Sequence, residues 1–344
     1  MRVAIIGESQ VGKSSLLRIL SDDKFTRGSG YFSGYGTFLL DDPNLDFLTR
    51  IYESEKKTPI HVEVFDFDGF GRLWKDDRKG EIKNDLAKFE AFIVVLSDSN
   101  SLNLLDTFYN IEYKLLLTDL DFVSRRLELL KKERTKKKVD EREISVLEKI
   151  ENWLAEEKPL NSLELSEPEK EIIKGHIFLS LLPQIFVINR EEPNLGKELP
   201  STILEKLAQR NAAFFVTSLK IEEELISLSW EEKREILASY GIEKGIKEEI
   251  SSAVIPALSV TVFYTAGKTE ARAWYVEKGA TAKKAAGRIH SDLERGFIRA
   301  EVINIEDLKR AGDEKRAKEL GLYRLEGKDY VVKDGDVLII RFSI

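Results

Sequence analysis

Short apolar runs alternate with amphipathic segments over the first two thirds of the chain. Five of these runs have the length and composition of buried strands. They are Val3–Ile6, His61–Phe67, Ala91–Ser97, Gln184–Arg190 and Ala212–Ser218. The segments between them place apolar residues three and four positions apart, which is the spacing of one helix face. This alternation predicts an α/β fold with a doubly wound, mostly parallel sheet, in which ligands bind at the carboxyl ends of the strands.

The interval between the third and fourth runs is too long for a single crossover helix. It contains two apolar stripes at helical spacing. The first comprises Tyr113, Leu116, Leu120, Val123, Leu127 and Leu130, and the second comprises Ile144, Leu147, Ile150 and Leu154. We expect two helices packed antiparallel along these stripes, with a lysine-rich tip near Lys131–Lys138. The stripes are packing seams, whereas the tip either follows a phosphate backbone or is simply solvated.

The pattern changes again near Thr261. Short β-like runs surround one helical stretch, Thr281–Phe297, and the chain closes with a turn and a strand, Lys333–Phe342. This predicts a small α+β domain at residues 261–344. The expected organisation is therefore an α/β domain in two parts, residues 1–111 and 176–260, interrupted by a helical insertion at residues 112–175.

Gly7 to Ser14 reads G-x-x-x-x-G-K-S and lies between the first apolar run and an amphipathic segment. Glycines let backbone N–H groups turn inward onto phosphates, Lys13 reaches the terminal phosphates, and the Ser14 hydroxyl can ligate magnesium. The helix that follows adds its positive dipole end. A chance glycine turn is the alternative, but the order of strand, loop and helix favours a phosphate-binding loop. The predicted phosphate-binding residues are Gly7, Gln10, Val11, Gly12, Lys13, Ser14 and Ser15.

Two further segments complete a predicted magnesium and γ-phosphate site. Asp66 lies at the end of the second run in the sequence D-F-D-G, where its carboxylate would hold the metal through water and the Gly69 N–H would face the γ-phosphate. The glycine-rich stretch Gly28–Leu40 has the composition of a loop that nucleotide and metal order, and its Thr37 is a candidate magnesium ligand beside Ser14 and Asp66. The alternatives are an ordinary turn at the strand end and a threonine that merely begins a strand.

The ends of the fourth and fifth runs are the expected site of the nucleotide base. GTP-binding proteins carry N-K-x-D there, whereas Asn189 to Glu192 reads N-R-E-E, with a last carboxylate that is one methylene longer. This change should weaken a bidentate contact with guanine and so admit ATP. Ser218 and Leu219, which follow Thr217, would form the second wall of the base pocket.

Composition narrows the classes of function. The chain has 344 residues, is 42% hydrophobic and 33% charged, and carries a formal net charge of -7. These values are typical of a globular protein and argue against a globally basic nucleic-acid binder, although a local basic patch is still allowed. The absence of cysteine excludes disulfides and thiolate metal sites, and the three histidines are too scattered to suggest a zinc site. No apolar run is long enough to span a bilayer and the N-terminus is itself the first strand, so we expect a cytoplasmic protein with no membrane partner.

Taken together, these residues resemble one family, the Obg-like ATPases, also called YchF, over nearly the whole chain. Phe263–Ile303 and Arg324–Phe342 look like the TGS domain of that family almost word for word. Leu115–Leu130 and Pro159–Lys174 look like its helical, coiled-coil insertion, and Leu219–Leu237 looks like the segment that leaves its G domain.

The resemblance implies a magnesium-dependent P-loop ATPase, sometimes also hydrolysing GTP, that associates with ribosomes and tunes translation or stress responses. It implies a G domain at residues 1–111 and 176–260, a coiled-coil insertion at 112–175 and a β-grasp TGS domain at 261–344. We expect a monomer. The residues that match the family's motifs are Gly7, Gly12, Lys13, Ser14, Thr37, Asp66, Gly69, Asn189 and Glu192.

Several positions depart from the family's pattern. Ser9 and Gln10 stand where the family usually carries Pro-Asn, and Arg190 stands where it prefers an apolar residue. The loop after the third run lacks a histidine that has been linked to hydrolysis in the family. Phe70 keeps the family's hydrophobic replacement of the glutamine that positions water in Ras-like proteins. The sequence therefore predicts nucleotide binding more securely than turnover, since either another group orients the water or hydrolysis is slow.

Three functions remain open on these residues. In the first, an ATPase switch, nucleotide orders Gly28–Thr37 and Asp66–Arg72 and reorients the helical arm and TGS domain against the ribosome. In the second, the chain is a nucleotide-gated RNA- or ribosome-binding module with little or no turnover. The third is a true GTPase. Candidate contacts to ribosomal RNA are the lysine-rich tip and Arg272, Lys283, Lys284, Arg288, Arg295 and Arg299; the alternative is a solvated surface, because acidic residues are interspersed.

Overall fold

The computed structural model describes residues 1–69, 79–98, 103–134 and 140–343. The contacts within the chain divide it into two compact units, each assembled from segments that lie far apart in the sequence. The larger unit comprises Arg2–Phe38 and Glu63–Ala253; the C-terminal unit comprises Met1, Leu39–Val62 and the residues from Val254 onward. No helix within the described residues is both long enough and apolar enough to cross a membrane.

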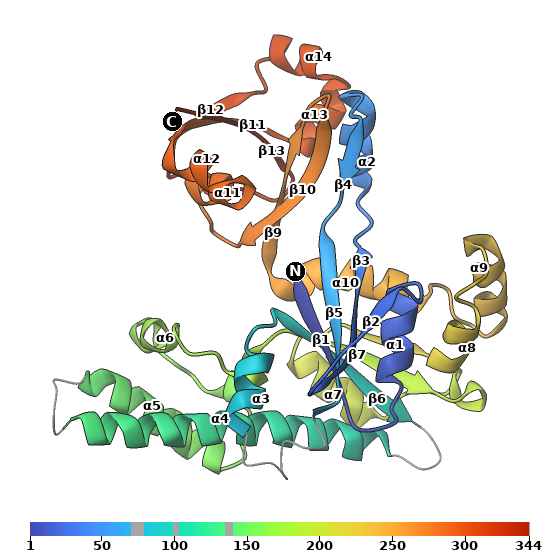
Figure 1. Cartoon of the computed structure of the whole chain (residues 1–344), viewed down its shortest axis with the longest axis vertical. Coiled ribbons are helices and arrows are strands. Elements are labelled where there is room, and N and C mark those ends of the chain that lie inside the picture. Colours follow the sequence, from blue (N-terminus) through green and yellow to red (C-terminus); the bar gives the residue numbers. More distant parts are fainter. Residues whose placement is uncertain (70–78, 99–102, 135–139, 344) are drawn as a thin grey trace. The chain divides into compact units, whose positions relative to one another are not determined.

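A seven-stranded sheet forms the centre of the larger unit (Figure 1). Its order is β2-β3-β5-β1-β6-β7-β8. The strands are β1 (Arg2–Ile6), β2 (Phe25–Arg27), β3 (Phe32–Leu39), β5 (His61–Phe67), β6 (Ala91–Asp98), β7 (Gln184–Arg190) and β8 (Phe214–Thr217). From β5 to β8 every neighbouring pair is parallel, so the five apolar runs form the predicted parallel core. Their carboxyl ends meet at one edge of the sheet, where the predicted motifs lie.

The glycine-rich stretch that we expected as a nucleotide-ordered loop forms a β-hairpin instead, because β2 pairs antiparallel with β3. Gly34 and Gly36 of β3 are buried against α1 (Lys13–Leu20). A Cβ atom added at these two glycines would lie 3.0 Å from Leu17 Cδ2 and 2.6 Å from Ser21 Cβ, respectively. The glycines therefore permit a close strand–helix approach. The interpretation of this composition as a loop was wrong for strand β3.

Helices α1, α3 (Lys79–Leu86), α4 (Leu104–Glu133) and α7 (Ser201–Gln209) pack against the sheet of the larger unit. Helix α8 (Leu219–Glu224) packs with α9 (Trp230–Ser239) in a small cluster of its own, and α10 (Ile246–Leu258) continues from the larger unit into the C-terminal unit. One hydrophobic core joins alternate residues of β1, among them Ala4 and Ile6, to α3, the first turns of α4, and α7. Because side chains alternate across a strand, Val3 and Ile5 face the opposite side of the sheet.

The helical insertion is an arm built from α4, α5 (Glu141–Ala155) and α6 (Glu167–Ile173). Ion pairs Arg126–Glu143 and Arg134–Glu141 join α4 to α5, which returns along it as the predicted antiparallel partner (Figure 1). The predicted seam is confirmed from Leu116 onward, since the buried core of the arm includes Leu116, Val123, Leu127 and Leu130 with Ile144, Leu147, Ile150 and Leu154, and Leu120 packs against it. The prediction was wrong for Tyr113, which is exposed. α4 begins at Leu104, because Asn103 caps it and its first turns belong to the core of the sheet.

The C-terminal unit is a mixed six-stranded sheet in the order β12-β11-β13-β9-β10-β4, packed on α11. Its other elements are β4 (Lys56–Thr58), β9 (Val260–Ala266), β10 (Glu270–Glu277), α11 (Ala282–Ile289), α12 (Ser291–Arg295), β11 (Phe297–Asn304), α13 (Ile305–Ala311), α14 (Glu314–Glu319), β12 (Arg324–Glu326) and β13 (Asp336–Phe342). Tyr330–Val332, which reads as a strand in the sequence, contributes only an isolated bridge from Val331 to Thr281.

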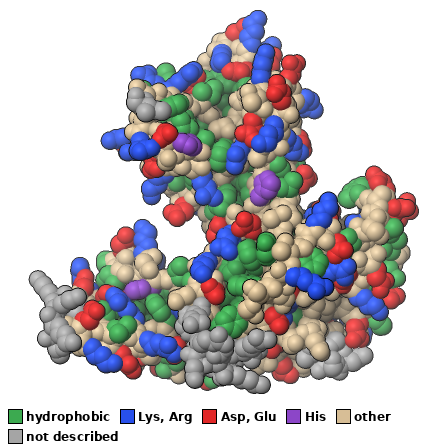
Figure 2. Space-filling view, viewed as in Figure 1, with side chains coloured by type: hydrophobic (Ala, Val, Ile, Leu, Met, Phe, Trp, Pro, Cys, Tyr) green, Lys and Arg blue, Asp and Glu red, His purple; other side chains and the backbone are tan. Residues whose placement is uncertain are grey.

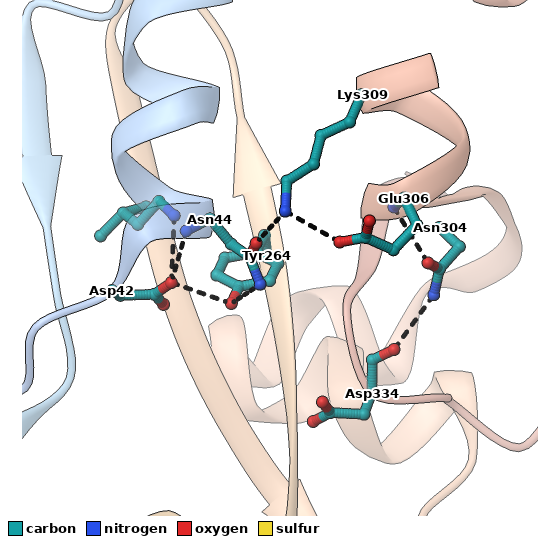
Figure 3. A network of polar contacts seen from close by, with 8 residues as sticks. Asp42, Asn44, Tyr264, Asn304, Glu306, Lys309 and Asp334 are labelled. Atoms are coloured by element: carbon teal, nitrogen blue, oxygen red, sulfur yellow. Dashed lines mark hydrogen bonds and ion pairs between the residues drawn. The ribbon is translucent and has the colours of Figure 1, made fainter. Parts of the chain in front are cut away.

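Residues from the first fifth of the chain belong to this C-terminal unit. β4 pairs in parallel with β10, with Lys56 opposite Glu270. The start of α2 (Pro43–Ile51) contributes Asn44 and the capping residue Asp42 to the polar network shown in Figure 3. Asp42 caps α2 by accepting hydrogen bonds from the N–H groups of Asn44 and Leu45, and it also accepts one from the Tyr264 hydroxyl at 3.2 Å. No local sequence pattern indicates this pairing, because neither of the two paired segments carries a distinctive motif.

Candidate nucleotide-binding site

The loop between β1 and α1 has the backbone geometry of a phosphate cradle. Gly12 adopts φ +104°, and a Cβ atom there would lie 2.8 Å from Asn189 Nδ2 and 2.9 Å from Leu219 Cδ1. A Cβ atom at Gly7 would lie 2.6 Å from the Val95 carbonyl oxygen. Both positions therefore require glycine. The loop ends at the N-terminus of α1, where backbone N–H groups without helical partners favour an anion.

Lys13 is a buried cation in this loop, with an exposed fraction of 6%. Its Nζ donates to the Glu8 carbonyl oxygen at 2.7 Å and lies 3.8 Å from Asp68 Oδ1. Burial lowers the pKa of Lys13, while the carboxylates of Asp66, Asp68 and Glu8 partly offset that effect. An ammonium held in this way is available to a bound phosphate at little cost in reorganisation.

Ser14 and Asp66 meet at the carboxyl ends of β1 and β5. Ser14 Oγ donates to Asp66 Oδ2 at 2.5 Å, and the register places Asp66 opposite Ile5. Asp66 Oδ1 is buried and has no hydrogen-bond partner among the residues that the structure describes, and burial raises the pKa of this carboxyl. An orphaned carboxylate oxygen beside a serine hydroxyl suits a magnesium ion, which prefers oxygen ligands and keeps several waters. The residues present thus fit the implied metal.

The third predicted metal ligand, Thr37, is exposed on β3. Gly69 is buried, and a Cβ atom there would lie 2.5 Å from the Phe67 ring. The neighbouring Asp68 N–H donates to the Tyr31 carbonyl at 2.9 Å, which ties the β2–β3 turn to the D-x-x-G segment. Phe70 lies outside the described residues.

Asn189 joins the phosphate loop to the predicted base loop. Its Nδ2 donates to the Val11 carbonyl at 2.9 Å, and its Oδ1 accepts from the Leu219 N–H at 3.0 Å. The strand register places Asn189 opposite Ser97 on one side and Thr217 on the other. One amide therefore fixes the loop that holds phosphates and the loop that would hold the base.

The side chains of Arg190 and Glu192 differ in burial and in the number of hydrogen bonds that they make. The Arg190 guanidinium is buried, with Nε donating to Asp98 Oδ2 at 2.8 Å and the other nitrogens donating to the Lys197 and Glu198 carbonyls. Arg190 is thus occupied in holding the loop after β7. Glu192 begins a short 3₁₀ turn and is exposed. Among the described residues, no side-chain hydrogen bond links Glu192 or Thr37 to the remainder of the site.

Sequence reasoning missed two features of this site. Glu222 is buried behind the base loop, where its carboxylate accepts from the Thr217 hydroxyl and, at 2.8 Å, from the Ile246 N–H. Burial raises the pKa of Glu222 to about 7. The second feature is an ion pair between Glu8 of the loop and Lys114 of α4. A glutamate three residues after Leu219 and a lysine within an apolar stripe were the only sequence signals.

The strand, glycine loop and helix around Lys13, with Asp66 and Asn189 at the ends of neighbouring strands, define a P-loop nucleotide-binding fold. A family model named YchF-GTPase C-terminal, and described as a protein of unknown function, matches residues 260–343. The chain is 33% identical to the "Ribosome-binding ATPase YchF" of Bacillus subtilis, with 100% of each protein covered. It is 33% identical to the protein of the same name from Haemophilus influenzae, covering 100% of this chain and 99% of that one.

A more distant relative, the "Obg-like ATPase 1" of Caenorhabditis elegans, is 28% identical and is covered to 92%. The Schizosaccharomyces pombe YchF GTPase structure superposes with a TM-score of 0.82 at 23% identity, covering 99% of this chain and 97% of that one, which supports the fold. The chain belongs to the YchF family of Obg-like ATPases.

Proposed function

We propose that this chain binds magnesium-ATP in the cradle around Lys13, hydrolyses it slowly, and acts in association with the ribosome. The observation that carries the proposal is the pair Ser14–Asp66. Its hydrogen bond of 2.5 Å leaves Asp66 Oδ1 buried and, within the described part of the chain, without a partner, an arrangement that is costly unless a ligand completes it.

Each predicted residue has a defined part in this proposal. The Gly7–Ser15 loop and Lys13 would hold the phosphates, and Ser14, Asp66 and Thr37 would hold magnesium. When bound, the metal would neutralise phosphate charge. Gly69 would present its N–H to the terminal phosphate. The structure ties Asp68, the residue before Gly69, to Tyr31, so the D-x-x-G segment and the hairpin that carries Thr37 are physically joined.

ATP is the proposed nucleotide, with GTP as a weaker second substrate. Asn189, Ser218 and Leu219 would form the base pocket, since Asn189 is fixed between the two loops. Arg190 cannot act as the lysine of N-K-x-D does, because its guanidinium is already bound to Asp98 and to two carbonyls. Glu192, exposed and one methylene longer than aspartate, fits a bidentate contact with guanine poorly.

We propose ribosome association because the relatives are named ribosome-binding ATPases. The distribution of basic side chains supports this proposal only at particular places on the surface. Figure 2 shows basic and acidic side chains intermixed over the surface that it presents. At the described end of the arm, Lys131 pairs with Glu148 and Arg134 pairs with Glu141. On α11, Lys283 and Lys284 are exposed. We therefore propose that the arm and the C-terminal unit contact ribosomal RNA, in a cytoplasmic monomer, through the basic side chains that these acids leave available.

The test is a titration of ATP and GTP with and without magnesium, run with a hydrolysis assay on wild type, Lys13→Ala and the control Lys88→Ala. We expect magnesium-dependent binding that prefers ATP, slow hydrolysis, and loss of both in Lys13→Ala alone. Binding without turnover would favour the nucleotide-gated binding module. Failure of wild type to bind either nucleotide would refute the site. Cosedimentation with ribosomes should weaken steeply as salt rises if phosphates are contacted.

A further inference from the structure

Two lysines from distant parts of the chain meet at one residue of the phosphate loop. Lys13 Nζ contacts the carbonyl oxygen of Glu8 at 2.7 Å, and Lys114 Nζ lies 2.6 Å from its Oε1. The side chains of Lys114 and Glu8 are only 14% and 21% exposed. After burial, the Lys114 ammonium is the remaining influence that lowers the pKa of Lys13, so the two cations share one electrostatic environment.

Glu8 is an unexpected residue for this loop. The backbone N–H groups, the helix N-terminus and Lys13 all favour an anion, whereas the Glu8 carboxylate repels one. Lys114 compensates that charge before nucleotide binds. A partly buried pair of this kind is costly to break unless a stronger partner replaces the lost one.

A triphosphate is such a partner, since it carries several negative charges where Glu8 carries one. We propose that Lys114 is a second phosphate-binding lysine, held at the loop by Glu8 and transferred to the terminal phosphate when nucleoside triphosphate binds. This rests on the proposed nucleotide binding. The freed Glu8 carboxylate lies near enough to the surface to be hydrated, and a diphosphate, with less charge at the same end, competes for Lys114 less well.

The origin of Lys114 gives the exchange a consequence. It lies in α4 (Leu104–Glu133), the first helix of the arm. The helix continues to Glu133, about 28 Å further along at 1.5 Å per residue. A lysine that changes partner with the terminal phosphate would therefore couple the phosphate state directly to the helix that carries the arm.

A purely structural ion pair predicts a different result, and the two readings can be separated. If the pair only fastens α4 to the loop, removing either charge should disturb the loop and weaken nucleotide binding alike. If Glu8 competes with phosphate for Lys114, removing the lysine should weaken binding and removing the carboxylate should strengthen it.

The experiment is calorimetric titration of the full chain with magnesium and either a non-hydrolysable ATP analogue or ADP. We expect Lys114→Met to weaken analogue binding about tenfold and ADP binding about twofold, and Glu8→Gln to strengthen analogue binding about threefold. Lys114→Arg should stay within about twofold of wild type, because it keeps the charge. Lys88→Met, which removes a lysine paired with Asp85 at 2.6 Å, is the matched control and should not change binding.

Thermal unfolding without nucleotide gives a second readout. Lys114→Met and Glu8→Gln should each lower the transition temperature, and the double variant should fall by less than the two losses combined. Equal weakening of analogue binding by both variants would overturn the proposal while leaving ATP binding intact. If wild type does not bind and Lys13→Ala changes nothing, the proposed function fails first and takes this inference with it.

Discussion

The phosphate site and the junction of α2 with the rest of the C-terminal unit are built from similar side chains but differ in whether the protein alone satisfies them. At the junction, Asp42 accepts three hydrogen bonds, and Lys309 Nζ bridges Asn44 at 2.7 Å and Glu306 at 2.8 Å (Figure 3). At the phosphate site, Asp66 Oδ1 is buried and has no hydrogen-bond partner among the described residues. Within the same residues, the first cluster contains no buried side-chain oxygen or nitrogen that lacks a partner.

This difference separates a polar cluster that supports the fold from one that is prepared for a ligand. A carboxylate that accepts several hydrogen bonds and leaves no buried oxygen unpaired stabilises its neighbours, whereas a buried oxygen without a partner lowers stability until something binds it. Substitutions should therefore change binding at one cluster and stability at the other.

The largest effect is expected at Asp66. Asp66→Asn keeps an oxygen that can accept from Ser14 but removes the charge that would hold magnesium. We expect magnesium-dependent ATP affinity to fall about 100-fold or more, while the transition temperature without nucleotide rises, because a buried charge has been removed. Titration and thermal unfolding measure the two quantities. If Asp66→Asn lowered the ATP affinity and the transition temperature together, Asp66 would have a structural role like that of Asp42.

The next effect concerns pH and Glu222, whose pKa is raised to about 7 by burial. Between pH 4.5 and pH 7 the carboxyl of Glu222 is protonated in the folded state and ionised in the unfolded state. The free energy of unfolding should therefore fall as pH rises from about 4.5 to about 7, by an amount on the order of 2 kcal/mol. Glu222→Gln mimics the protonated form, since its amide can donate to Thr217 and accept from Ile246. Urea unfolding across pH 5–8 should lose this slope in the variant. An unchanged slope would assign the titration elsewhere.

The smallest effect is expected at the junction. Tyr264→Phe removes the hydroxyl that donates to Asp42, which should cost about 1 kcal/mol. Protection of the α2 amides in hydrogen exchange should drop by that amount, and a double-mutant cycle with Asp42→Ala should show coupling. Nucleotide affinity should not change. A loss of affinity comparable to that of Asp66→Asn would end the distinction between the two clusters.

The sequence was informative where local pattern determines structure. Buried parallel strands read as apolar runs, and the phosphate loop needs glycines at fixed positions, so β1, β5, β6, β7 and the cradle could be predicted. The β2–β3 hairpin could not be predicted. Gly34 and Gly36 allow strand β3 to lie close to α1, but a glycine-rich composition is equally typical of a loop. Thr37 as a metal ligand and the four-part division of the chain stay predictions.

Contacts between residues far apart in the sequence could not be predicted either. Lys114 lies in a helix whose stripe predicted packing, and its partner Glu8 is 106 residues away. Arg190 was expected near the base, yet its guanidinium is taken by Asp98, which lies in the adjacent strand β6. No short-range pattern carries information on such contacts, since they depend on register and on the course of α4.

The pairing of β4 with β10 also bears on the order in which the chain is made. Thr58 and Glu270, which hydrogen-bond at 2.6 Å, are 212 residues apart. At roughly 5–20 residues per second, α2 and β4 leave the ribosome about 10–40 s before their sheet exists. During synthesis α2 and β4 lack their partner strands while the larger unit is still being made, so completion of the C-terminal unit is a late step for residues that are made among the first.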